Sequence, residues 1–142
     1  MKNAFNKFIS FFISFFTFLF GSFDFMLKVL LSLMFLDYVT GVSRAFITKK
    51  INSSIGGKGI IKKVVYLCVI SVAVILDNLL EMNGSLRALI IYSFIFNEML
   101  SILENSSAVG IKVPNILYKS LEKINKDNTE NDIKNLKIDK TK

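Results

Sequence analysis

The chain alternates long apolar stretches with short polar ones. Four stretches, residues 5–25, 27–47, 60–80 and 86–103, carry few charges. Each is close to the roughly 20 residues that a membrane-spanning helix needs. The polar connections between them are too short to form domains. The pattern therefore predicts an all-α integral membrane protein: a bundle of three to four transmembrane helices with short loops and a polar, partly disordered C-terminal tail.

Three regions follow from this pattern. Residues 1–25 form a Phe-rich hydrophobic helix that we expect to be an additional span, and residues 26–104 form the transmembrane core, with spans at 27–47, 60–80 and 86–103. Residues 105–142 form the tail. In the tail, apolar residues at helical spacing after Pro114 predict a short amphipathic helix, and the mixture of Lys, Asn, Asp and Glu beyond it is typical of disorder.

The Phe-rich segment carries a polar stripe. Its small and polar residues follow one another at alternating spacings of four and three, which places them on one side of a helix. They are Asn3, Lys7, Ser10, Ser14, Thr17, Gly21 and Asp24. Such a stripe suits close packing of membrane helices, or a surface that faces water when several copies surround a hole. A third interpretation is a helix lying in the membrane plane, although such helices usually have a more strongly charged face.

Composition supports the membrane assignment and excludes several classes of function. The chain is 52% hydrophobic, with a mean hydropathy of +0.50, and a soluble domain of this length would leave a large apolar patch exposed. The net charge of +7 comes from residues that flank the apolar stretches, which indicates lipid headgroups rather than nucleic acid. There is no His, and Cys68 is the single cysteine. We therefore expect no metal, no cofactor and no enzymatic activity.

The distribution of positive charge predicts the topology. Lys49, Lys50, Lys58, Lys62 and Lys63 are concentrated in what the pattern indicates is a loop, and the tail after Leu103 holds eight lysines. Because basic loops stay on the cytoplasmic side, this loop and the C-terminus should be cytoplasmic, with the turn at Asn83 outside. If the first stretch also spans, the N-terminus is cytoplasmic as well.

A few polar residues inside the apolar stretches need an explanation. Asp37, Gly41 and Arg44 share one helix face, but Asp37 and Arg44 are about 10 Å apart along the axis. Their partners are therefore expected on other helices or other subunits. Asp77 could pair with Arg87 across the turn. Asp37 and Glu98 are candidates for lining an aqueous path, because buried charges in membranes are tolerated only when paired, protonated or hydrated.

An ordered set of motifs resembles one family. The set begins with LDYVTG at 36–41 and KKINSSIGGKGIIKK at 49–63. It continues with Asp77, Glu98, SILEN at 101–105 and GIKVP at 110–114. Together they resemble the toxin-secretion/phage-lysis holins, the TcdE-type family of clostridia and their phages, over residues 27–124.

The resemblance implies a small protein that oligomerises in the bacterial cytoplasmic membrane and permeabilises it. Its partners would be further copies of itself and the lipid bilayer. Its cargo would be an endolysin or a large toxin, without necessarily direct contact. In such a protein no residue is catalytic, and the candidates are positions for pore lining or assembly. They are Ser10, Ser14, Thr17, Gly21, Asp37, Gly41, Arg44, Asp77 and Glu98.

Two other classes of function stay open at this point. One is a small ion- or proton-coupled transporter or channel that uses Asp37 and Glu98. The other is a membrane anchor that presents the basic tail to a cytoplasmic partner.

Overall fold

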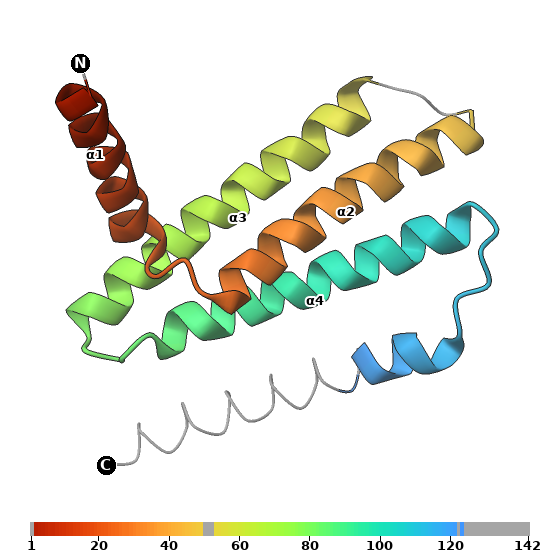
Figure 1. Ribbon diagram of the computed structural model, residues 1–142. Helices are drawn as coiled ribbons and strands as arrows, with labels where there is room; N and C mark the ends of the chain where they lie inside the picture. The colour runs from red at the N-terminus through yellow and green to blue at the C-terminus, as the bar shows by residue number, and fades with distance from the viewer. Residues whose placement is uncertain (1, 50–52, 122, 124–142) are drawn as a thin grey trace, which may run out of the picture.

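The computed structural model describes residues 2–49, 53–121 and 123, and all of its regular elements in these residues are helical. The four long helices are α1 (Lys2–Phe20), α2 (Phe25–Ile47), α3 (Ser53–Leu79) and α4 (Ser85–Ala108), as Figure 1 shows. A further helical stretch covers residues 115–121. Lys50 and the part of the tail expected to be disordered lie outside the described residues. The predicted all-α class is confirmed.

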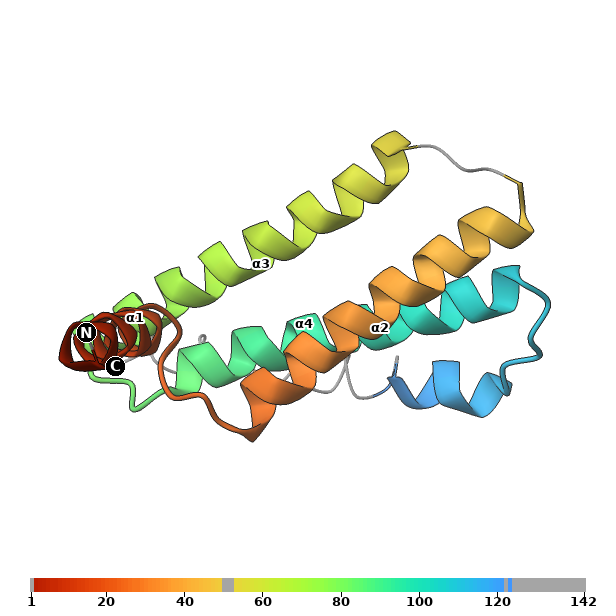
Figure 2. The same cartoon turned by 45° about the horizontal axis from the view of Figure 1, so that its top comes forward.

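Helices α2, α3 and α4 form an elongated bundle in which successive helices run antiparallel (Figures 1 and 2). All three are long and apolar enough to cross a membrane, over Phe25–Ile47, Gly56–Leu79 and Ser85–Ala108. Asp24 caps α2, because its carboxylate accepts a hydrogen bond from the Leu27 N–H at 3.0 Å. The bundle therefore supplies the membrane core that the hydropathy pattern predicts.

Each bundle helix buries one narrow seam. On α3 the seam runs through Lys63, Tyr66, Ile70, Ala73 and Asp77, at spacings of three and four. The central core consists of Leu30, Met34, Tyr66, Ile70, Val74, Ile91 and Ile95. Most of the remaining apolar side chains, such as Phe35 and Val72, are exposed. An apolar outer surface around a thin core is what a bundle in lipid requires, because the lipid tails are as apolar as the side chains.

Helix α1 is arranged differently from the other three. It runs across the bundle instead of along it, and meets it only near the C-terminal end of α1 (Figures 1 and 2). Its apolar part, Phe5–Phe20, is shorter than the three candidate spans. The predicted apolar helix to residue 25 is interrupted, because α1 ends at Phe20 and the chain turns at Gly21 with φ +72°.

The connection between α2 and α3 is shorter than the sequence pattern indicates. We interpreted residues 48–63 as a loop that turns into the next helix, because they are rich in Gly, Ser and Lys. The structure instead begins α3 at Ser53, so that Gly56, Gly57 and Gly59 are helical. The first turns of a helix that ends in an apolar span can carry polar residues where they reach the headgroups, and this accounts for the difference.

Candidate functional site

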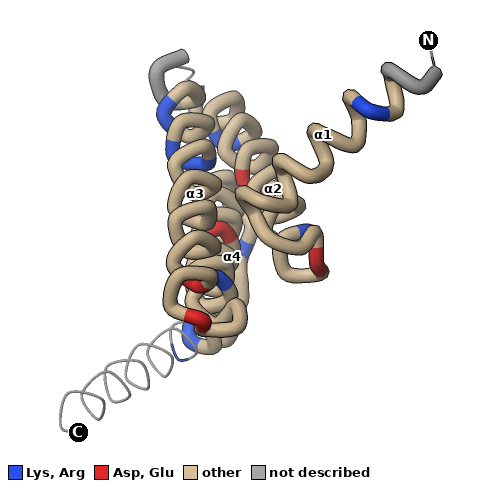
Figure 3. The backbone as a smooth tube through the Cα atoms, turned by 90° about the vertical axis from the view of Figure 1, so that its left-hand side faces the viewer, with Lys and Arg blue, Asp and Glu red and all other residues tan. Residues whose placement is uncertain are grey.

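The apolar core lies between two layers of polar side chains. We call the first the Lys63 layer; it consists of Asp37, Thr40, Lys63, Glu98 and Asn105. We call the second the Arg87 layer; it consists of Asp24, Asp77 and Arg87. Figure 3 shows acidic and basic positions at several levels of the bundle. The residues of both layers lie on the same buried helix faces as the apolar core.

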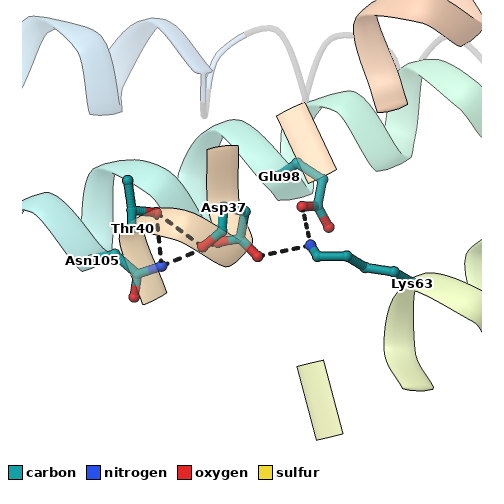
Figure 4. A network of polar contacts seen from close by, with 5 residues as sticks. All are labelled: Asp37, Thr40, Lys63, Glu98 and Asn105. Atoms are coloured by element: carbon teal, nitrogen blue, oxygen red, sulfur yellow. Dashed lines mark hydrogen bonds and ion pairs between the residues drawn. The ribbon is translucent and has the colours of Figure 1, made fainter. Parts of the chain in front are cut away.

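The Lys63 layer is centred on an ammonium group held by two carboxylates (Figure 4). Lys63 Nζ on α3 lies 2.8 Å from Asp37 Oδ2 on α2, and it also donates to Glu98 Oε2 on α4. One cation therefore connects all three helices of the bundle. Without Lys63, the like charges of the Asp37 and Glu98 carboxylates would repel each other.

Asn105 extends this layer on α4. Its amide nitrogen lies 3.1 Å from Asp37 Oδ1 and 3.3 Å from Thr40 Oγ1, and it donates to both. Its carbonyl oxygen accepts from Arg44 Nη1 at 3.3 Å. Both oxygens of Asp37 are thus occupied, and Arg44 reaches the layer through Asn105.

Burial makes these contacts energetically important. The side chain of Glu98 is 2% exposed, that of Lys63 is 14% and that of Asp37 is 17%. Among the described residues, every buried side-chain nitrogen or oxygen has a hydrogen-bond partner. Removing Lys63 would leave two carboxylates without a cation, which costs far more than the intact group contributes. Both carboxylates therefore depend on Lys63.

The Lys63 layer lies inside the membrane-spanning part of the bundle. Asp37 follows Asp24 by 13 residues, and Glu98 follows Arg87 by 11, so the two layers are about 17–20 Å apart along the helices. Helices α2 and α4 each continue ten residues beyond Asp37 and Glu98, or about 15 Å. A hydrocarbon core is about 30 Å thick, so a span centred on these helices places Asp37 and Glu98 within it.

The Arg87 layer holds together the end of the bundle at which α2 and α4 begin. The Arg87 guanidinium donates to Phe20 O at 2.7 Å, to Ser22 O at 2.8 Å and to Asp24 Oδ2 at 2.7 Å. The hydrogen bond from Arg87, aided by the Leu27 N–H and by the charge of Arg87, holds the pKa of Asp24 below its ordinary value. These three hydrogen bonds of the guanidinium thus go to the end of α1 and to its connection with α2.

Asp77 plays a different part in the Arg87 layer from the one we expected. Its carboxylate accepts from the backbone N–H groups of Leu86, at 3.0 Å, and Arg87, at 2.7 Å. It therefore caps the N-terminus of α4 across the turn, where orphan N–H groups favour an anion. The expected contact between Asp77 and Arg87 exists, but through the backbone; the guanidinium pairs with Asp24.

The structure brings together the two intramembrane carboxylates predicted from the sequence. Asp37 and Glu98 meet through Lys63, and the partners of Asp37 lie on other helices, as its distance from Arg44 suggested. Gly41 faces Asn105, since a Cβ there would lie 3.6 Å from the amide nitrogen. Whether these positions line a pore stays a prediction.

The polar stripe of α1 does not reach the Lys63 layer. Ser10 and Ser14 are exposed, and the Thr17 hydroxyl donates to the Ile13 carbonyl in its own helix. Gly21 lies against Arg87, where a Cβ would come within 2.8 Å of Nε. A role of this stripe in assembly stays a prediction as well.

Sequence reasoning missed Lys63 and Asn105 as members of the site. We interpreted Lys63 only as one of the basic residues that set topology. Lys49, Lys58 and Lys62 are indeed exposed, whereas Lys63 points into the bundle. The signal was present in the spacing, because Lys63 continues the seam of Tyr66 and Ile70 by one turn. Asn105 follows Glu98 by seven residues, which is two turns on the same face.

Comparison with known proteins identifies the family. The model of the bacteriophage holin family matches residues 14–126. An uncharacterised protein of Clostridium perfringens (strain 13 / Type A) is 45% identical over 115 residues, which cover 80% of this chain and 84% of that protein. A protein of Bacillus phage phi105 named "Probable holin" is 33% identical over 113 residues, 80% of this chain and 83% of its own length.

No solved structure matches the chain. The family match includes Asp37, Lys63, Glu98 and Asn105 within its span, and it confirms the resemblance that the sequence motifs indicated. The chain therefore belongs to the bacteriophage holin family, as a holin-like, multi-pass protein of the cytoplasmic membrane.

Proposed function

We propose that this protein oligomerises in the bacterial cytoplasmic membrane and opens holes that release an endolysin or a large toxin. The observation that carries the proposal is the Lys63 layer, in which one ammonium group binds two carboxylates inside an apolar bundle. Membership of the holin family supports the membrane-permeabilising activity. The size of the apolar outer surface supports further contacts, with lipid or with other copies.

The Lys63 layer suits a protein with a closed and an open state. In the closed subunit, Lys63 binds both Asp37 and Glu98, so each of the three side chains has a partner of opposite charge within the bundle. Buried ion pairs contribute little net stability, because desolvation offsets their attraction. If the helices separate and the layer faces a water-filled hole, hydration replaces the lost pairing. The same residues are therefore tolerated in both states, and a change in their charge shifts the balance between them.

The orientation follows from the basic residues. Lys49, Lys58 and Lys62 are exposed near the α2–α3 connection, and Lys112, Lys119 and Lys123 follow α4 at the same end of the bundle. With this end in the cytoplasm, the Arg87 layer lies at the outer face of the membrane and the C-terminus is cytoplasmic.

Controlled expression in a bacterium tests the proposal. Viability, entry of an impermeant dye and escape of a folded cytoplasmic enzyme without a signal peptide would be followed together. We expect a delay followed by abrupt loss of viability and release of the enzyme. If an immunoblot shows the protein in the membrane and the cells nevertheless stay intact, the proposal is refuted.

Charge variants link the activity to the Lys63 layer. Asp37→Asn and Glu98→Gln keep shape and remove one charge each, and we expect both to change the time of lysis at equal expression. Glu104→Gln is the matched control, because Glu104 lies on the same helix and is exposed. Selective ion or proton flux without escape of the enzyme would instead indicate the transporter class. An anchor would produce neither effect.

A further inference from the structure

A groove with a volume of about 480 Å³ lies between α1 and the bundle. Its walls are almost entirely apolar, and they come from three helices. Phe12, Phe16 and Phe20 belong to α1, Leu27 and Leu31 to α2, and Leu67 to α3. This groove takes no part in the Lys63 layer. In a bilayer a space of this kind cannot stay empty, so the question is what fills it.

The direction of α1 decides which part of the membrane reaches the groove. In Figures 1 and 2, α1 crosses the axis of α2–α4, and in Figure 3 it extends away to one side of the bundle. If α2, α3 and α4 span the membrane, α1 lies along it. Its apolar part of 16 residues, Phe5–Phe20, is about 24 Å long, which is less than the roughly 30 Å of a hydrocarbon core.

The faces of α1 agree with this placement. At 3.6 residues per turn, Ser10 and Ser14 lie on nearly the opposite side of the helix from Phe12. Phe16 and Phe20 lie between these two sides, and they line the groove together with Phe12. The Phe side of α1 therefore borders the groove, while the Ser side points away from Phe12. A helix at a membrane surface has this arrangement, with its apolar face a few ångströms below the headgroups.

The Arg87 layer fixes α1 in this position. Arg87 binds the carbonyl oxygens of Phe20 and Ser22, the residues on either side of Gly21. The left-handed backbone at Gly21 makes the sharp turn between α1 and α2. The angle of α1 is therefore set by hydrogen bonds to the bundle. The groove below α1 exists because these bonds fix that angle.

A positive charge lies beside the groove. Lys28 is exposed in the first turn of α2, and its ammonium lies 5.6 Å from the centre of the Phe23 ring. Phe23 is itself part of the groove lining. An acyl chain in the groove would thus place its headgroup within reach of a cation, which favours an anionic lipid.

We propose that α1 lies in the plane of the leaflet at the Arg87 end of the bundle, and that the groove beneath it binds an acyl chain of an anionic phospholipid. Lys28 selects the headgroup, and the Phe side chains of α1 cover the chain. This role requires that the bundle spans the membrane, but it does not require hole formation. The lipid site can therefore be refuted without refuting the proposed function, and the reverse.

The experiment uses fluorescence, because the chain contains no Trp. The full-length protein is reconstituted in mixed vesicles of phosphatidylcholine and phosphatidylglycerol, with brominated acyl chains on one lipid or the other. Phe16→Trp places a probe in the groove, with Leu31→Trp as a second probe on α2. Phe18→Trp is the control, because Phe18 is 67% exposed and does not line the groove. Circular dichroism checks the helicity of each variant.

We expect brominated phosphatidylglycerol to quench both groove probes more strongly than an equal fraction of brominated phosphatidylcholine. Phosphatidylglycerol should be enriched about fivefold over phosphatidylcholine in the groove, because one Lys attracts an anionic lipid surface by about 1 kcal/mol. Phe18→Trp should show no preference, and Lys28→Gln should remove it from the groove probes. Equal quenching by both lipids, or a groove probe that neither lipid reaches because another copy covers it, would overturn the lipid site.

The depth of α1 is read in the same vesicles. Phe8→Trp and Phe16→Trp are eight residues apart, about 12 Å along the helix. With bromine at different positions of the acyl chain, the two probes should report the same depth if α1 lies in the membrane plane. A difference of about 12 Å would show that α1 runs through the membrane and would overturn the proposal.

Discussion

A side chain at Gly21 would collide with Arg87. A Cβ at this position lies 2.8 Å from Arg87 Nε and 3.2 Å from Cδ, both in a side chain held by three hydrogen bonds. The contact joins the start of α4 to the turn after α1, although 66 residues separate them in the chain (87 minus 21). Glycine is therefore required at position 21 for two reasons, the close approach of Arg87 and a φ of +72°.

Replacing Gly21 with Ala should destabilise the protein. The left-handed backbone alone costs about 1–3 kcal/mol for a non-glycine residue, and displacement of Arg87 adds to this. We expect a lower thermal unfolding midpoint for Gly21→Ala in detergent, measured by circular dichroism. Gly57→Ala is the control, because Gly57 is helical with nothing within 4 Å of a Cβ, and alanine there should be neutral or stabilising. Equal midpoints for both variants would contradict the account of Gly21.

The pair between Asp24 and Arg87 predicts a dependence of stability on pH. The pKa of Asp24 is lowered below the ordinary value of 3.8, mainly by the hydrogen bond from Arg87. Because the folded protein favours the carboxylate, this contribution is fully present above pH 3.8 and is lost as the pH falls through the lower folded value. The free energy of unfolding in detergent should fall between neutral and strongly acidic pH. Part of this fall should be absent in Asp24→Asn, which has no carboxylate to protonate at position 24. Parallel curves for the two proteins would refute the prediction.

The topology can be tested with single cysteines. Cys68 is first replaced by Ala. Lys58→Cys then places a thiol at an exposed position near the start of α3, and Ser85→Cys places one at the start of α4, at the other end of the bundle. Because basic residues are retained in the cytoplasm, an impermeant thiol reagent added to intact cells should label Ser85→Cys and leave Lys58→Cys unlabelled. Permeabilised cells are the control, since both variants should react there. Labelling of Lys58→Cys from outside would reverse the orientation.

The membrane fold follows from the sequence because long apolar stretches have few alternatives in lipid. The positions of Asp37 and Glu98 within these stretches were also sufficient to select them as candidates. The length of α3 was less predictable. Gly56, Gly57 and Gly59 weaken a helix, and only its continuation into the apolar span after Ile60 makes the segment helical.

The partners within the site were harder to predict than its carboxylates. Lys63 belongs to a run of basic residues whose other members are exposed, so its charge alone gives no indication that it is buried. The position is determined by the register of α3 against α2 and α4, which is a property of packing. The direction of α1 is likewise set by the contacts of Arg87 with Phe20 and Ser22, which no local pattern reveals.

Removing the charge of Lys63 should destabilise the protein strongly. Lys63→Met keeps an unbranched side chain but leaves Asp37 and Glu98 as two buried carboxylates without a cation. Breaking a buried ionic group in this way typically costs about 3–5 kcal/mol, and we expect a corresponding loss in the free energy of unfolding in detergent. Lys62→Met is the matched control, because Lys62 precedes Lys63 and is exposed. It should change stability much less.

Neutralising the carboxylates should then restore much of this stability. In the triple variant Lys63→Met, Asp37→Asn, Glu98→Gln none of the three charges remains, and the amide oxygen at position 37 can still accept a hydrogen bond from Asn105. The three substitutions should therefore be strongly non-additive, since residues in one network share their interaction energy. The coupling is measured by comparing unfolding free energies of the single, double and triple variants. Additive effects would mean that Lys63 stabilises the bundle by packing and that its charge is incidental, which would also remove the physical basis for a charge-controlled opening.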